Sequence, residues 1–224
     1  GSRSWNRHHR IESIEEVPSV PVKCIGVDNE SHLYLAGKEL IPTHNTYGVA
    51  LLNFLDLFFK PGCEIASAGA IIAQADRCYE YLLEFFRFPW FKEWCSKYQA
   101  KMGVNFVTKT TIGETILANG SKLEIIAGTD KGLRGPHPHK ARVDEIDIMD
   151  WKVFQTGLSM SKSGTDKTGK PIRGQNVFTS TRQQAAGTMQ RLLDEAKDKG
   201  ITVYEWNVWE IVQTCTRLCQ GDPE

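Results

Sequence analysis

The sequence lacks several features that would place it quickly in a class of proteins. Its 224 residues contain no run of about 18 apolar residues, and the opening GSRSWNRHHR is polar and basic, so neither a transmembrane span nor a secretory signal is predicted. The formal net charge is zero, from 27 Lys and Arg against 27 Asp and Glu, so no global field favours nucleic acid or anionic lipid. We therefore expect a cytoplasmic protein without a membrane partner, whose ligands must be argued from local sites.

Paired cysteine motifs are also missing. The six cysteines are scattered without any Cys-x-x-Cys, which favours reduced, mostly buried thiols over a disulfide framework or a zinc ribbon. The content of 41% hydrophobic and 24% charged residues is typical of a globular chain with a sizeable core. The leading Gly1-Ser2 is interpreted as an expression remnant and is excluded from the fold.

The first 45 residues have a different pattern from the rest. Val17 to Val27 carries β-branched residues interrupted by two prolines, and residues 31–41 (SHLYLAGKELI) alternate apolar and polar positions around Ala36-Gly37, which predicts a hairpin. A β-segment of this size cannot bury its own apolar face. We therefore expect it to pair with the remainder of the chain or with another polypeptide.

From Thr46 onward the apolar period lengthens from two toward about 3.6, and strands alternate with helices. Helices are predicted over 47–60, 72–88, 90–98, 151–159 and 185–199. Strands are predicted over 64–68, 104–110, 115–118, 122–127, 140–143, 176–181 and 202–206, with a type I′ turn at Asn119-Gly120. This alternation predicts an α/β fold with a mostly parallel sheet.

Three loops at the ends of predicted strands carry residues suited to phosphate and metal binding. Asp144-Glu145 follows an apolar strand, where an aspartate can hold Mg²⁺ and an adjacent glutamate can polarise water, although acids are also common at ordinary strand-to-helix turns. Residues 177–182 (VFTSTR) end in hydroxyl side chains and an arginine, and residues 128–135 (GTDKGLRG) form a glycine-rich basic loop. We expect these loop ends to converge on a bound anion.

A complete phosphate loop is absent, because no Gly-x-x-x-x-Gly-Lys-Ser/Thr motif occurs anywhere in the chain. Thr46 nevertheless stands directly before an apolar helix, where the last residue of such a loop would stand. His44 and Asn45 precede it. An asparagine side chain can cyclise onto its own carbonyl and cut the chain behind it, a neighbouring histidine can polarise that bond, and a following hydroxyl can accept an acyl group.

Residues 22–46 (VKCIGVDNESHLYLAGKELIPTHNT) resemble the C-terminal segment of an intein, which implies an all-β, Hint-type fragment. The resemblance implies splicing roles for Asn45 as the cyclising residue, His44 as its assistant, Thr46 as the downstream nucleophile and His32 as a supporting histidine. Cys24 stands where many inteins carry an aspartate. The N-terminal intein portion is missing, so the implied partner is a complementary N-terminal half that carries the phosphate loop. Splicing itself needs no cofactor.

Residues 46 to about 205 resemble the ATPase domain of bacteriophage terminase large subunits, the motors that pump double-stranded DNA into capsids. The matching stretches are GLRGPHP (132–138), RVDEID (142–147) and TSTR (179–182), in the order found in that family. The resemblance implies a P-loop-type ATPase core that lacks its phosphate loop and uses ATP and Mg²⁺ after splicing. The implied partners are double-stranded DNA, a homo-oligomeric ring and a portal, in the cytoplasm of an infected bacterial host cell.

The same resemblance assigns individual residues. It makes Asp144 and Thr46 the Mg²⁺ ligands, Glu145 the catalytic glutamate, and Arg134 a finger that acts on the ATP of a neighbouring subunit. It assigns the coupling motif to Ser180 and Thr181, and it places Arg182 with them among the residues that bind the nucleotide.

The expected organisation is an intein fragment over 1–45, an ATPase domain over 46–205, and the start of a linker toward a nuclease domain over 206–224. Two alternatives stay open. A helicase-like ATPase would translocate on single strands. A non-catalytic nucleic-acid-binding module, with the N-terminal hairpin as an edge extension, predicts an uncut chain and no response to Mg·ATP.

Overall fold

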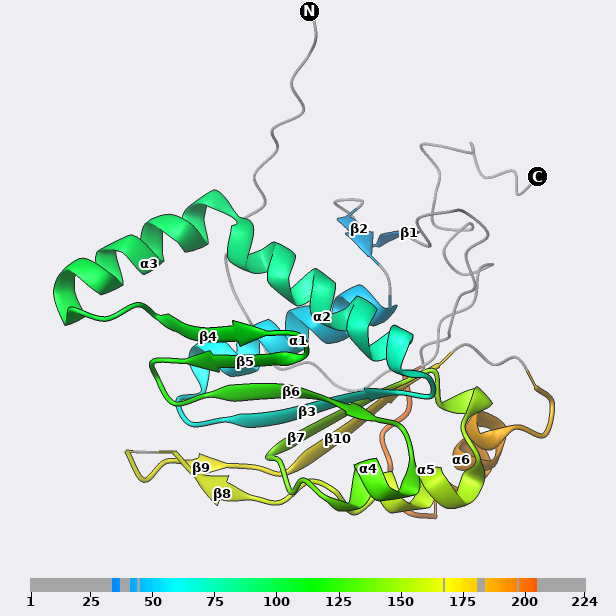
Figure 1. The fold of residues 1–224 in the computed structure, drawn as a ribbon. Coiled ribbons are helices and arrows are strands. Elements are labelled where there is room, and N and C mark those ends of the chain that lie inside the picture. The colour runs from blue at the N-terminus through cyan, green and yellow to red at the C-terminus, as the bar shows by residue number, and fades with distance from the viewer. Residues whose placement is uncertain are drawn as a thin grey trace, which may run out of the picture.

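The computed structural model describes residues 34–36, 41–43, 45–166, 168–180, 184–196 and 198–204, with side chains from Thr46 onward. A six-stranded sheet with the order β10-β7-β3-β6-β5-β4 forms its centre (Figure 1). The strands are β3 (Glu64–Gly69), β4 (Val107–Thr111), β5 (Glu114–Leu117), β6 (Lys122–Ala127), β7 (Lys140–Asp144) and β10 (Gln175–Thr179). The first four strands in the sheet order are mutually parallel, whereas β5 runs antiparallel to both of its neighbours. The mixed α/β fold with a mostly parallel sheet is therefore confirmed.

Helices cover both faces of this sheet. The helices α1 (Asn45–Phe59), α2 (Ile72–Arg87) and α3 (Pro89–Met102) lie on one side, and α4 (Asp130–Arg134), α5 (Trp151–Gly157) and α6 (Thr188–Ala196) lie on the other (Figure 1). A short 3-10 helix, η1 (Ile146–Ile148), follows β7. The five helices predicted from Thr46 onward are present, but α3 continues to Met102 instead of 98, and α6 spans Thr188–Ala196 instead of 185–199.

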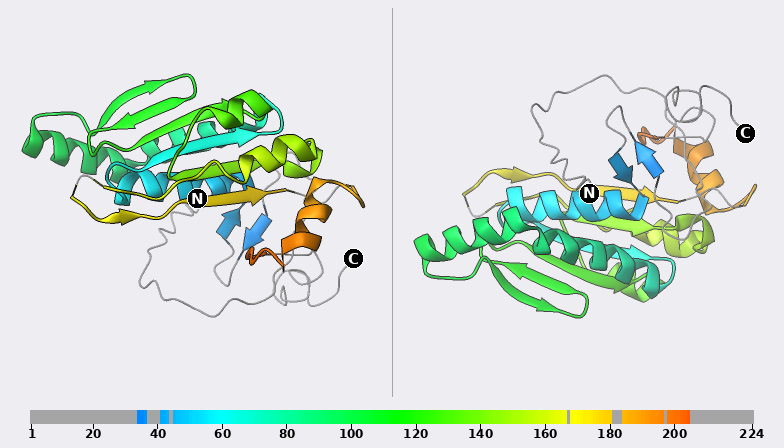
Figure 2. Two further views of the ribbon diagram at one scale, coloured as in Figure 1. Left: turned by 90° about the horizontal axis from the view of Figure 1, so that it is seen from below. Right: turned by 90° about the horizontal axis from the view of Figure 1, so that it is seen from above.

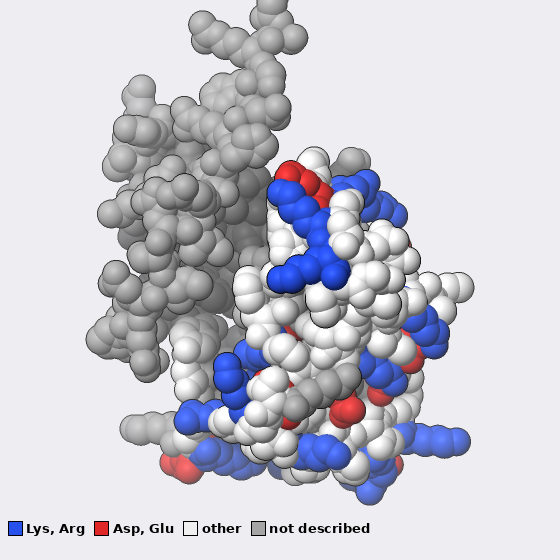
Figure 3. Space-filling view, turned by 90° about the vertical axis from the view of Figure 1, so that its left-hand side faces the viewer, with Lys and Arg blue, Asp and Glu red and all other residues white. Residues whose placement is uncertain are grey.

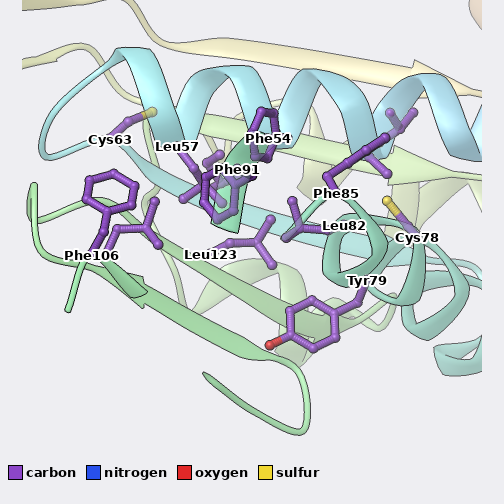
Figure 4. Packing of buried hydrophobic residues seen from close by; sticks show 14 of the residues in the cluster. Phe54, Leu57, Cys63, Cys78, Tyr79, Leu82, Phe85, Phe91, Phe106 and Leu123 are labelled. Carbon is purple, nitrogen blue, oxygen red and sulfur yellow. The ribbon is translucent and has the colours of Figure 1, made fainter. Parts of the chain in front are cut away.

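The core has one half on each face of the sheet. On the α1–α2 face, the side chains of Phe54, Leu57, Leu82, Phe85 and Phe91 pack onto Leu123 of β6 (Figure 4). The opposite half holds Ala68, Leu133, Val143, Phe154 and Leu192. Strands β3 and β7 are buried on both faces, as central strands of a parallel sheet commonly are, although β7 (KARVD) alternates charged and apolar residues.

The β5–β6 hairpin was predicted correctly, but its turn type was wrong. Gly120 has a φ of 88°, whereas Glu145 is the one non-glycine residue with positive φ in the described part of the chain, so Asn119 does not adopt the left-handed conformation that a type I′ turn requires. The Gly120 N–H donates to the Leu117 carbonyl at 2.9 Å. The connection is therefore a three-residue loop that ends in a left-handed glycine.

Other sequence predictions also need correction. Residues 128–135 are not simply a loop, because Thr129 caps the short helix α4 by accepting the Gly132 N–H at 3.1 Å. Residues 202–204, predicted as part of a strand, form none. The loop over 161–174 contains a small antiparallel pair, β8 (Gly164–Thr165) and β9 (Pro171–Ile172).

An N-terminal hairpin is present as β1 (Tyr34–Ala36) and β2 (Ile41–Thr43), but its register differs from the prediction: Ala36, predicted at the turn, lies in β1 opposite Ile41. They form a two-stranded sheet of their own, separate from the six-stranded sheet. The preceding β-branched run, Val17 to Val27, lies outside the described residues. Within the described residues no helix combines the length and apolar character needed to cross a bilayer.

Candidate functional site

Asp144 lies at the centre of the candidate site, at the carboxyl end of β7. Its side chain is buried, and each carboxylate oxygen accepts a hydroxyl: Thr46 Oγ1 donates to Oδ2 at 2.6 Å, and Thr179 Oγ1 donates to Oδ1 at 2.6 Å. The Glu145 N–H also donates to Oδ1, at 3.0 Å. Thr46 and Asp144 are 98 positions apart in sequence, so the fold brings together the two residues predicted to share a Mg²⁺ ion.

Thr179, on β10, supplies the second hydroxyl that donates to Asp144. It is not among the site residues predicted from the sequence. Thr179 is directly paired with Asp144 in the parallel register of β10 and β7. The signal was present in the TSTR stretch, but the choice among its hydroxyls depends on the register of the two strands. The predicted Ser180 is buried and lies one position further, where its Oγ accepts the Asp147 N–H at 3.0 Å and donates to Glu145 Oε2 at 3.5 Å.

Glu145 adopts a left-handed backbone conformation, with φ 55° and ψ 48°. Such a conformation is unfavourable for a residue with a Cβ and persists where the surrounding structure enforces it, often at functional sites. Here the backbone is held on both sides of the residue: the Asp144 carbonyl accepts the Ala70 N–H at 3.3 Å, and the Asp147 N–H donates to Ser180. The turn therefore fixes the direction in which the Glu145 side chain leaves the strand end.

Asp147 connects the loop after β7 to the segment that leads into α6. It is 2% exposed, and its carboxylate accepts the Gln184 N–H at 2.8 Å and the Met189 N–H at 3.1 Å. Gly187 has to be a glycine here, because a Cβ at that position would come within 2.2 Å of Asp147 Oδ1. In the sequence, Asp147 is visible only as the last residue of the RVDEID stretch, and that stretch by itself indicates no role for it.

A buried ion pair fixes α1 on the sheet. Arg142, which is 1% exposed in the middle of β7, donates from Nη2 to Asp56 Oδ2 at 2.7 Å and to Gln175 Oε1 at 3.3 Å. Lys60 pairs with the other oxygen of the same carboxylate. Burial lowers the pKa of Arg142, and Asp56 opposes that shift. A charged residue in the middle of a buried strand needs a partner, so Arg142 is the signal in the sequence for this contact.

Of the remaining predicted site residues, the structure describes Arg134 in full and Asn45 by its backbone alone. Arg134 lies exposed on α4, where its Nε donates to Asp130 Oδ2 at 2.8 Å. Asn45 begins α1, but its side chain is not described. The residues that lie outside the described part of the chain are Cys24, His32, His44, Thr181 and Arg182.

The donor set around Asp144 fits a hard divalent cation that is completed by other ligands. A threonine hydroxyl and a carboxylate supply the oxygen atoms that Mg²⁺ prefers, and Mg²⁺ is commonly held by one or two carboxylates with phosphates and water. Within the described residues no group of three or more His, Cys, Asp or Glu side chains is arranged to hold a metal by itself. The residues present therefore suit a Mg²⁺–nucleotide complex better than a stand-alone metal centre.

Comparison with curated proteins finds short matches to replicative helicases. A 55-residue stretch is 58% identical to the replicative DNA helicase DnaB of Mycobacterium leprae (strain TN), and a 53-residue stretch is 50% identical to that of Mycobacterium intracellulare. These stretches cover 25% and 23% of this chain but only 8% and 9% of the helicases. No family model matches the chain.

Comparison with solved structures finds phage terminases. The large terminase of bacteriophage HK97 matches with a TM-score of 0.49 and 15% identity over 70% of this chain and 32% of that one. The large terminase of a thermophilic bacteriophage gives 0.47 and 11%, over 86% and 44% of the two chains. The ATPase domain of a Thermus phage large terminase gives 0.44 and 14%, over 73% and 59%. The chain thus spans less than two thirds of each of these three structures.

Proposed function

We propose that this chain supplies most of an ATP-hydrolysing site of the terminase type. The observation that carries the proposal is the hydrogen bond from Thr46, at the start of α1, to Asp144, at the end of a parallel strand. A hydroxyl at a helix N-terminus beside a strand-end carboxylate is the arrangement that holds a Mg²⁺–nucleotide complex in P-loop ATPases. The motif order over residues 132–182, given above, adds the resemblance to terminases.

In this proposal Thr46 and Asp144 would hold Mg²⁺, which when bound neutralises charge on the phosphates. Glu145, held in a left-handed turn directly after β7, orients the attacking water and accepts its proton. Ser180, whose hydroxyl donates to the Glu145 carboxylate at 3.5 Å, forms the coupling motif with Thr181, and Arg182 binds the nucleotide. Arg134 acts on the nucleotide of a neighbouring subunit in a homo-oligomeric ring, at a portal, with double-stranded DNA as the substrate that is moved.

The missing phosphate loop arrives through protein splicing in this proposal. Residues 1–45 act as the C-terminal half of a split intein. The Thr46 hydroxyl first accepts the acyl chain of the complementary half as an ester, which frees that half's own leaving group. Asn45, with the help of His44, then cyclises onto its own carbonyl and breaks its peptide bond to Thr46, and the acyl chain passes from the Thr46 oxygen to the freed Thr46 amine. The described hairpin β1–β2 ends two residues before Asn45, as the resemblance implies. The match to the helicase of Mycobacterium leprae is confined to 8% of that protein. An intein inserted into two different host proteins would also produce a match of this limited length.

A helicase-like ATPase is the second candidate, and the short matches to DnaB helicases favour it. The two candidates differ in the nucleic acid that stimulates ATP turnover. A packaging motor responds to double-stranded DNA, whereas a helicase responds to single strands. Measuring turnover of the ligated protein with each form distinguishes them.

The ATPase proposal is tested by Glu145→Gln in the product of mixing this chain with the complementary half. ATP turnover should fall about 10²- to 10⁴-fold, because a general base is lost, while Mg·ATP binding is retained. Glu93→Gln, at an exposed position on α3, is the control and should leave turnover unchanged. Unchanged turnover in Glu145→Gln would remove Glu145 from the catalytic role.

The splicing proposal is tested by Asn45→Ala. Mass spectrometry of the wild-type mixture should show a product that is ligated at Thr46 and a released N-terminal segment. Asn45→Ala should abolish release, because no side-chain amide remains to cyclise. Asn105→Ala, at an exposed position, serves as the control. Continued cleavage at this junction in Asn45→Ala would contradict the assignment.

A further inference from the structure

A groove of about 700 Å³, a size typical of small-molecule sites, opens at the amino ends of β7 and β10. One wall is the end of α1 with Phe59 and Lys60, and the other is the β8–β9 hairpin with its turn. In both views of Figure 2 this hairpin lies at one end of the molecule and α6 at the other. Lys140 starts β7 and Asp144 ends it, so about 13 Å of strand separates the groove from the candidate site.

Lys140 lines this groove although its side chain is buried, at 4% exposed. Its ammonium donates to the Arg173 carbonyl at 2.9 Å, which uses one of its three N–H donors. Within the described residues it forms no ion pair with a carboxylate, and the nearby Asp56 pairs instead with Lys60 and Arg142. Burial and the neighbouring Lys60 lower the pKa of Lys140. A buried charge is costly unless it is paired, so this ammonium favours a bound anion in the groove.

The groove carries an excess of positive charge. Besides Lys140, the cationic side chains in its lining are Lys60, Lys170 and Arg173. Among the described residues that line it, one carboxylate, that of Asp166, opposes them. Asp166 Oδ1 already accepts the N–H groups of Thr168 and Lys170, each at 2.8 Å, and the Thr168 hydroxyl at 2.7 Å. Lys and Arg side chains gather around the lower part of this end of the molecule (Figure 3). The groove therefore suits an anion with more than one negative charge.

The hairpin wall of the groove is fixed at its base. The Gly174 N–H donates to Ser163 Oγ at 2.9 Å, and a Cβ at Gly174 would come within 2.8 Å of the Lys162 carbonyl carbon. A Cβ at Gly164 would come within 2.5 Å of His139 Nε2. Because the backbone packs this closely, the wall has its shape before a ligand arrives. Binding to such a preorganised wall costs little ordering entropy.

The opposite wall adds an aromatic surface. Phe59 is 67% exposed and lines the groove beside Pro61. Its ring packs edge-on against Phe58, with 4.8 Å between the ring centroids. Bases stack on exposed aromatic side chains while neighbouring cations hold their phosphates. The groove therefore offers a flat apolar contact on one side and an anion-binding contact on the other.

We infer that this groove is a second ligand site, separate from the one at Asp144, and that it binds a small phosphomonoester with a flat ring, the chemistry of a free 5′-mononucleotide. Lys140 and Arg173 contact the phosphate, and Phe59 contacts the base. A terminal phosphate carries a charge of about −1.5 to −2 at neutral pH and ends the molecule, so it can reach a buried ammonium. A phosphodiester within a nucleic-acid strand is tethered on both sides and carries less charge, so it fits Lys140 less well.

The test is calorimetric titration of the full chain with AMP in the presence of EDTA, so that no Mg²⁺ supports binding at Asp144. AMP should bind saturably. Adenosine and inorganic phosphate each lack half of the ligand and should bind about tenfold more weakly or worse. Arg173→Gln should weaken AMP binding about tenfold, because a charge-assisted contact to the phosphate is lost. Arg77→Gln, at an exposed position on α2, is the matched control and should bind AMP like the wild type.

Two further variants separate the parts of the site. Phe59→Ala should weaken the binding of AMP but not that of inorganic phosphate, because only the base contacts the ring. Lys140→Met should weaken the binding of both, because it removes the buried charge. Phe59 and Arg173 are exposed, so their variants should fold, and they carry the test if Lys140→Met does not fold. Circular dichroism and urea unfolding verify the fold of each variant.

No saturable binding of AMP, equal affinity for adenosine and AMP, or wild-type affinity in Arg173→Gln would each overturn the inference. Tighter binding of a single-stranded oligonucleotide without a terminal phosphate would assign the groove to nucleic acid and overturn the choice of ligand. Hydrogen exchange locates the bound AMP, which should slow exchange over residues 170–175. Protection confined to the residues around Asp144 would place AMP in the other site and would also overturn the inference.

Discussion

Two aspartates only three positions apart, Asp144 and Asp147, have different surroundings and different tasks. The Asp144 carboxylate gathers two hydroxyls from distant elements, Thr46 and Thr179, and faces the end of the sheet where a ligand would bind. The Asp147 carboxylate instead accepts backbone N–H groups and so holds the segment before α6. The surroundings of Asp144 suit ligand binding, whereas those of Asp147 hold the backbone at Gln184 and at Met189 in place.

At this scale we predict that Asp147→Asn lowers the free energy of unfolding by about 1–3 kcal/mol, because one of the two backbone donors loses its acceptor in a buried place. Urea unfolding measures the change. Asp198→Asn, an exposed aspartate in the turn after α6, should change stability little. Equal stability of the two variants would show that Asp147 does not hold this loop.

At the scale of elements, the placement of α1 decides whether the site forms. Its first turn places Thr46 beside Asp144, and its last turn places Asp56 beside Arg142 of the same strand, β7. The helix is thus attached at both ends to one strand. Leaving one member of a buried ion pair without its partner is costly, whereas replacing both members by apolar side chains often costs little.

We therefore predict that Arg142→Leu lowers the free energy of unfolding by about 3 kcal/mol, because it leaves the Asp56 carboxylate buried without Arg142. The double variant Asp56→Leu/Arg142→Leu should recover most of this loss. A double-mutant cycle from urea unfolding gives the coupling energy. Additive effects of the two single changes would mean that the pair does not hold α1 on the sheet.

At the scale of the whole molecule, two buried thiols make stability depend on alkaline pH. Burial, with Asp56 nearby, raises the pKa of Cys63 to about 11. Burial, with Asp144 nearby, raises the pKa of Cys78 to about 12, and Ser67 and Asn53 hydrogen-bond to its sulfur. Both thiols are therefore protonated and unreactive in the folded chain at neutral pH.

The sign of the effect follows from which state loses its protons first. Above a pH of about 9 the unfolded chain ionises these thiols while the folded chain still holds their protons, so stability should fall as the pH rises from about 9 toward about 11. Burial also lowers the pKa of Lys140, which acts in the opposite direction. Urea midpoints of the wild type and of Cys63→Ala/Cys78→Ala, compared across this range, isolate the thiols. Parallel pH profiles would contradict the prediction.

The sequence by itself determined the local parts of this protein. The apolar period after Thr46, the β-branched runs and the Gly and Pro boundaries are properties of neighbouring residues, and they predicted the alternation of strands and helices and the parallel sheet. They also pointed to Asp144-Glu145, because a strand end is visible in the sequence. Only the tertiary structure decided that Thr46 reaches Asp144 and that Thr179 is the second hydroxyl there. The register of β10 on β7 and the packing of α1 set those contacts, and both arise from interactions between residues far apart in the chain.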